Sequence, residues 1–124
     1  MTIRKFSIPV TTNGSGAATV YSPYLSGYIE NIEYVKTDFS NGSTFTLTAE
    51  ATGETIWGES SVNASTRRKP RAATHTTAGV AATYDGTRAA LDRIALGRDR
   101  VKIVIASGGD TKTGTFIVAV DDGR

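Results

Sequence analysis

Two strand-length runs of β-branched residues near the C-terminus constrain the fold of this chain more than any other feature. Residues 101–106 (VKIVIA) and 115–120 (TFIVAV) have high β propensity, and residues 107–114 between them are rich in glycine and small polar side chains. This pattern predicts two strands joined as a closing β-hairpin. A chain that ends in this way is typical of all-β proteins.

The preceding residues also predict short strands separated by turns. Apolar side chains alternate with serine and proline in residues 6–10 (FSIPV), and the proline suits a strand at a sheet edge. Residues 44–49 (TFTLTA) alternate between threonine and apolar residues, as expected for a strand buried on one face. Glycine-containing clusters such as residues 13–16 (NGSG) supply turns.

Two segments fit more than one secondary structure. Residues 27–36 (GYIENIEYVK) fit a helical stripe or a strand, and their aromatic and β-branched content favours a strand. Residues 87–96 fit a short helix capped by Gly97, or equally a helical turn that runs into a strand near Ile94.

Eight or nine short strands in 124 residues predict an all-β, single-domain β-sandwich that spans residues 1–124, with a jelly-roll-like or immunoglobulin-like arrangement. One long irregular loop is expected between residues 60 and 86. Seven apolar residues are expected to share the core between the two sheets. They are Phe45, Leu47, Ile103, Ile105, Phe116, Val118 and Val120.

Residue types that serve catalysis and metal binding are scarce. The chain has no cysteine and a single histidine, His75, and its carboxylates are scattered without metal-loop spacing. Residues 110–115 (DTKTGT) approach two phosphate-chemistry motifs, but Thr111 separates the aspartate from the lysine, and the residues that follow predict a strand where a P-loop needs a helix. We therefore expect no enzyme, and no catalytic, cofactor-binding or metal-binding residue.

The expected loop contains the one concentrated cluster of charge, residues 67–71 (RRKPR). Three interpretations compete: contact with phosphate, ion pairing with an acidic protein partner, or a solvated loop. Because Ile56 and Trp57 alternate on a short predicted strand, one of them is expected near the surface, and we choose Trp57. The predicted partner contacts are Arg67, Arg68, Lys69, Arg71 and Trp57.

Charge and hydropathy limit the classes of partner. A formal net charge of +2 is too small to indicate a nucleic-acid surface. No apolar run reaches the length of a signal-peptide core or a membrane span, so we expect synthesis in a cytoplasm and no membrane partner.

Residues 92–109 (DRIALGRDRVKIVIASGG) and 112–116 (KTGTF) resemble small β-rich virion proteins of tailed bacteriophages, which decorate phage heads. The resemblance implies a structural virion protein on the capsid exterior that binds and stabilises the major capsid protein lattice. It also implies a homotrimer or another small oligomer, made in the host cytoplasm. A phage tail or receptor-binding (adhesion) module is the alternative.

Overall fold

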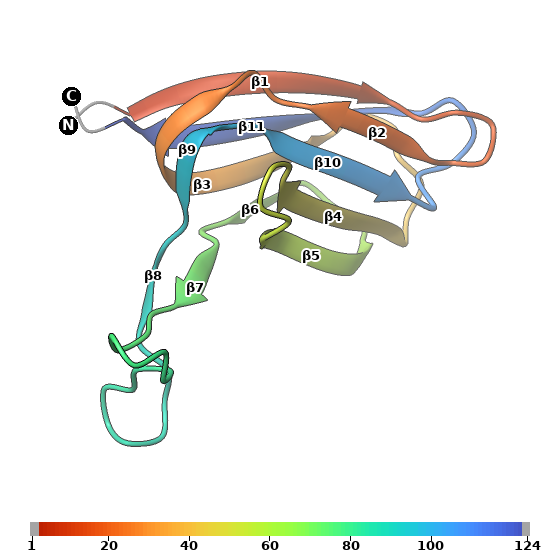
Figure 1. The fold of residues 1–124 in the computed structure, drawn as a ribbon. Coiled ribbons are helices and arrows are strands. Elements are labelled where there is room, and N and C mark those ends of the chain that lie inside the picture. The colour runs from red at the N-terminus through yellow and green to blue at the C-terminus, as the bar shows by residue number, and fades with distance from the viewer. Residues whose placement is uncertain (1–2, 123–124) are drawn as a thin grey trace.

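The computed structural model describes residues 3–122, and within them the chain forms eleven strands and no helix (Figure 1). The strands are β1 (Ile3–Thr11), β2 (Ala18–Tyr21), β3 (Leu25–Lys36), β4 (Ser43–Ala49), β5 (Thr55–Val62), β6 (Thr66–Arg68), β7 (Arg71–Ala73), β8 (Leu91–Arg93), β9 (Ala95–Asp99), β10 (Val101–Ala106) and β11 (Thr113–Asp121). The predicted all-β fold is confirmed.

Most strands belong to two antiparallel sheets. One sheet has the order β1-β11-β3-β6, with β9 also paired to β3, and the other has the order β2-β10-β4-β5. The pair β7-β8 forms a small third sheet. Strand β1, which contains Pro9, lies at a sheet edge as its sequence predicted.

The strand order distinguishes between the two predicted arrangements. Strand β6 pairs with β3 at residues 32–34, and β9 pairs with β3 at residues 25–28, so the two short strands follow one another along the same neighbour. Counted as one interrupted strand, they give eight strands in which the first pairs with the last, the second with the seventh, the third with the sixth and the fourth with the fifth. This nested pairing is jelly-roll order and not immunoglobulin order.

The predicted closing hairpin is wrong. Strand β10 pairs with β2 and β4, whereas β11 pairs with β1 and β3, so the two strands lie in different sheets. The connection between them crosses from one sheet to the other beside the connection that joins β1 to β2. Thr12 N–H donates to Lys112 O at 2.8 Å, and Gly108 N–H donates to Gly16 O at 2.9 Å. Each strand therefore has both neighbours supplied by distant parts of the chain.

The core lies between the two large sheets. All seven predicted core residues are at most 2% exposed. Aromatic rings meet edge to face at its centre, with ring centroids of Phe45 and Phe116 5.0 Å apart and those of Tyr34 and Phe45 4.7 Å apart. The burial of these large side chains from both sheets is the main source of stability for the sandwich.

Both ambiguous segments form strands. Residues 27–36 lie within β3, and residues 87–96 contain β8 and the beginning of β9, so Gly97 is a strand residue and not a helix cap. Gly27 has a φ of 126°, and a Cβ at this position would clash with the carbonyl oxygen of Asp121. Glycine is therefore required where β3 bends between its two partners.

Candidate functional site

The interrupted strand of the jelly roll gives rise to a projection. The chain leaves the sandwich after β6, extends outward through β7, and returns through β8 to rejoin the sheet at β9 (Figure 1). Strands β7 and β8 pair antiparallel, with Ala72 opposite Asp92. We refer to residues 71–93 as the arm.

The end of the arm is folded by its own backbone hydrogen bonds. Thr74 N–H donates to Ala90 O at 2.9 Å, Ala90 N–H donates to Ala82 O at 2.9 Å, and Ala82 N–H donates to Thr74 O at 3.0 Å. These three bonds form a closed ring from which two small hairpins extend, residues 74–82 and residues 82–90. Because its polar backbone groups are paired internally at the junction, the arm has a defined shape without a core.

Ion pairs brace the base of the arm against the sandwich. The guanidinium groups of Arg71 and Arg93 lie 3.7 Å and 3.3 Å from the carboxylate of Glu30. Arg93 also pairs at 2.8 Å with Asp121, whose side chain is only 6% exposed, and lies 4.6 Å from the ring centre of Tyr28. Hydrogen bonding to Asp121, and to a smaller extent to Glu30, raises the pKa of Arg93. Two cations on the two strands of the arm thus fix its base to β3 and β11.

Large apolar side chains on the arm face solvent. Val80, Tyr84 and Leu91 are 62%, 66% and 60% exposed. One exposed apolar side chain is ordinary on a protein surface, but three on a single projection have no core of their own to enter. The arm therefore exposes apolar area that the rest of residues 3–122 leaves uncovered.

The predicted basic cluster is divided among separate carboxylates. Arg67 pairs with Glu33 at 3.2 Å. Arg68 donates from Nε and Nη2 to the two carboxylate oxygens of Glu59, at 2.9 Å and 3.0 Å, and this hydrogen bonding lowers the pKa of Glu59. These pairs link β6 to β3 and β5. The structure therefore adds intramolecular ion pairing to the three interpretations of residues 67–71.

The other two cations of the cluster differ from each other. Arg71 braces the arm, as described above, and also donates to the carbonyl oxygen of Pro70 at 2.8 Å. Lys69 is exposed, and residues 3–122 provide no ion-pair partner for it. The four predicted contact cations are thus not brought together as one free patch.

Trp57 does not lie near the surface, and this prediction is wrong. It is 6% exposed, its ring centre is 5.5 Å from that of Phe45, and its indole N–H donates to Glu59 at 3.0 Å. The register between β4 and β5 shifts here, because Leu47 faces Trp57 while the next residue of β4 faces Thr55. Ile56 is the extra residue of a β-bulge, so strict alternation fails and both large side chains are buried.

Sequence reasoning missed a ridge of aromatic and basic side chains. The guanidinium carbon of Arg100 lies 4.0 Å from the ring centre of Tyr21 and 5.3 Å from that of Tyr24. Arg100 also binds both carboxylate oxygens of Glu50, at 2.7 Å and 2.8 Å, which lowers the pKa of Glu50. We refer to Tyr21, Tyr24 and Arg100 as the ridge. The two tyrosines that flank Ser22-Pro23 were the sequence signal for it.

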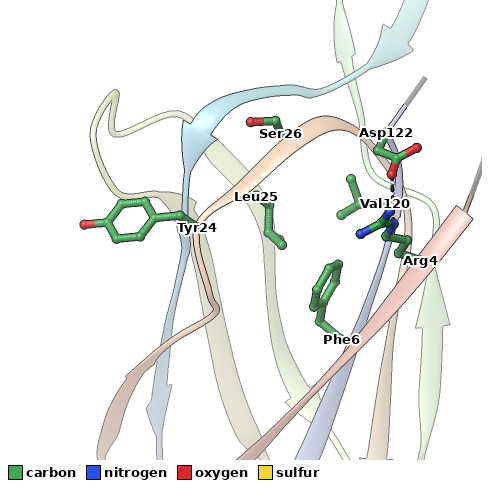
Figure 2. A pocket seen from close by; sticks show the side chains of 7 residues that line it. All are labelled: Arg4, Phe6, Tyr24, Leu25, Ser26, Val120 and Asp122. Carbon is green, nitrogen blue, oxygen red and sulfur yellow. Dashed lines mark ion pairs between the residues drawn. The ribbon is translucent and has the colours of Figure 1, made fainter. Parts of the chain in front are cut away.

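An open cavity of about 200 Å³ adjoins the ridge at Tyr24 (Figure 2). Figure 2 shows Phe6, Leu25 and Val120 converging at its floor, with the ion pair between Arg4 and Asp122 at its rim. The paired atoms of Arg4 and Asp122 are 2.9 Å apart. Tyr24 and Ser26 complete the lining.

The residues considered for chemistry are dispersed. His75 is exposed on the arm, and the DTKTGT segment spans the crossing between sheets and the beginning of β11. Within residues 3–122, no group of three or more His, Cys, Asp or Glu side chains could hold a metal ion. The same residues contain no helix long and apolar enough to cross a membrane.

No protein-family model and no curated protein matches this chain.

Proposed function

We propose that this chain is a structural protein that binds neighbouring protein subunits through its arm, in the capsid of a tailed bacteriophage. The observation that carries the proposal is the arm itself. It combines an internally bonded backbone, a braced base and three exposed apolar side chains, Val80, Tyr84 and Leu91.

A preformed projection is suited to binding because little ordering is needed when it meets its partner. The arm interrupts a strand of an otherwise complete jelly roll, and its exposed apolar side chains add nothing to the common core. A segment with these properties gains burial only by contact with another molecule. Loops presented by a rigid scaffold commonly carry binding function in this way.

The identity of the partner follows from the resemblance of residues 92–109 and 112–116 to phage head decoration proteins. On that basis the partner is the major capsid protein, and the chain acts on the capsid exterior as a small oligomer, such as a homotrimer. Jelly rolls occur in viral capsid proteins and in lectins, so the fold alone is compatible with more than one role.

A tail or receptor-binding module is the second candidate, and exposed tyrosines are the observation in its favour. Tyr21, Tyr24, Tyr28 and Tyr84 are all more than a third exposed. A sugar platform needs a free ring face, however, and guanidinium groups lie over the rings of Tyr21 and Tyr28. This covering favours contact with protein over stacking on a glycan.

Shortening the arm tests the proposal. Replacing residues 74–90 by Asn-Gly joins β7 and β8 through a two-residue hairpin turn and leaves the braced base in place. We expect this variant to fold, with a free energy of unfolding within about 1 kcal/mol of the parent, and to lose co-sedimentation with phage heads. Val80→Ala is the single-residue comparison within the arm. Head occupancy equal to that of the parent would contradict the proposal.

A further inference from the structure

The cavity and the ridge adjoin at Tyr24, which lines the cavity while its ring extends away from Phe6, Leu25 and Val120 (Figure 2) and lies near Arg100. We refer to the cavity and the ridge together as the receiving face. It combines tyrosine and arginine, which are common among residues that dominate protein interfaces, with a small apolar depression. Arg100 is held in place by Tyr21 and Glu50, so the face is ordered before any partner arrives.

The dimensions of the cavity indicate what it can accept. Its volume of about 200 Å³ is below the range of roughly 300–1,000 Å³ found for small-molecule sites. Phe6, Leu25 and Val120 provide an apolar floor, and the ion pair at the rim provides charges of both signs. A single large side chain with polar neighbours fits this combination.

The second hairpin of the arm presents a side chain of this kind. Tyr84 is 66% exposed and is followed in the same turn by Asp85 and Arg88, which pair at 3.5 Å. The first hairpin carries Val80 without any Asp, Glu, Lys or Arg between residues 74 and 82. Tyr84 therefore has a large ring next to an ion pair, as the cavity has an apolar floor next to an ion pair. Val80 has neither the ring nor the ion pair.

We infer that the receiving face of one copy binds the arm of a second copy, with Tyr84 in the cavity, Asp85 facing Arg4 and Arg88 facing Asp122. The two intramolecular ion pairs would then align with opposite polarity, which is the favourable arrangement for two pairs in contact. This inference rests on the proposed role of the arm as a contact between subunits, and it adds a second copy of the chain to the major capsid protein as a partner of the arm.

A contact between the arm and the receiving face limits the symmetry of the assembly. The arm and the receiving face are different surfaces, so each copy donates one contact and accepts another. Such head-to-tail contacts generate a closed ring when the rotation between copies closes, and an open filament when it does not. Because the arm extends away from its own sandwich (Figure 1), the contact joins separate chains.

Disulfide trapping tests the contact directly, since the natural chain contains no cysteine. Purified Tyr84→Cys and Ser26→Cys proteins are mixed without phage heads under mild oxidation. We expect this mixture to form covalent heterodimers about tenfold faster than two control mixtures, Thr77→Cys with Ser26→Cys and Tyr84→Cys with Ser60→Cys. Thr77 is an exposed residue of the first hairpin. Ser60 is exposed on β5, at the sheet edge opposite β2. Equal rates in all three mixtures would overturn the inference.

Sedimentation of non-cysteine variants gives the second readout. Tyr84→Ala removes the donated side chain, and Arg4→Ala removes one charge of the ion pair beside the cavity. Each should weaken self-association about tenfold, whereas Thr77→Ala in the first hairpin should not. A parent chain that stays monomeric and gives no specific cross-link would overturn the inference. If shortening the arm still abolished head binding in that case, the proposed function would be supported and only the contact between two copies would be rejected. If the shortened chain bound heads normally, the proposed function would fail, whatever the cross-linking showed.

Discussion

The sandwich and the arm are stabilised by different interactions. In the sandwich, side chains such as Phe45 and Phe116 are completely buried between two sheets. In the arm, Val80, Tyr84 and Leu91 are at least 60% exposed, and order comes from backbone hydrogen bonds and from ion pairs at the base. The sandwich therefore carries most of the free energy of unfolding of the chain. The arm is ordered but contributes little to that free energy.

The largest expected effect of a single substitution lies in the sandwich. Phe116→Ala should lower the free energy of unfolding by about 3 to 5 kcal/mol, because Phe116 is fully buried and its ring contacts those of Tyr34, Phe45 and Trp57. Denaturant unfolding measures this loss. Tyr84→Ala in the arm is the matched aromatic substitution and should cost less than about 0.5 kcal/mol. Similar losses at the two positions would remove the distinction between the regions.

A pH-dependent effect of intermediate size is expected from the buried Tyr34. Burial, reinforced by the nearby charge of Asp38, raises the pKa of Tyr34 from 10.0 to about 12. A raised pKa favours the neutral phenol in the folded state, so this contribution to stability is complete below pH 10 and is lost as the pH rises toward 12. The loss should be about 3 kcal/mol.

Unfolding measured between pH 9 and pH 12 checks this expectation. The Tyr34→Phe variant lacks the ionisable group, so its free energy of unfolding should fall less steeply over this interval than that of the parent. The slope with pH is the relevant quantity, because the substitution also alters packing in the core. Parallel slopes for the two proteins would show that Tyr34 does not couple ionisation to folding.

The smallest effect is local to the arm. Arg93→Ala removes ion pairs with Glu30 and Asp121, so the base of the arm should open more often. We expect amide hydrogen exchange at Ala82 and Ala90 to accelerate about tenfold, with exchange in the sandwich core unchanged. Arg68→Ala is the control, because it breaks an ion pair with Glu59 outside the arm. Faster exchange throughout the sandwich would contradict a bracing role limited to the arm.

Local patterns in the sequence predicted the strands and the core of the sandwich. Alternation placed Phe45 and Leu47 on the inner face, and the β-branched run at residues 101–106 forms β10. Strand partners were not predictable in the same way. Strands β10 and β11 resemble a hairpin locally, but their hydrogen bonds are satisfied by strands from distant parts of the chain.

The site was predicted less completely than the fold. One long irregular loop was predicted over residues 60–86, but this range contains the end of β5 and the short strands β6 and β7, and the arm continues beyond it through β8. The partners of Arg67 and Arg68 depend on the register of β3, β5 and β6, which no local pattern encodes. Trp57 was misplaced because one extra residue in β5 breaks the alternation on which the prediction relied.

The central claim is that the arm binds another subunit and the sandwich does not need it to fold. Amide hydrogen exchange of the parent chain, measured free and bound to phage heads, tests this claim most directly. We predict that protection on assembly increases chiefly at the amides of residues 74–90, with little change in the core strands β10 and β11. Unchanged exchange in residues 74–90, with new protection along the exposed edge of β5, would contradict the account.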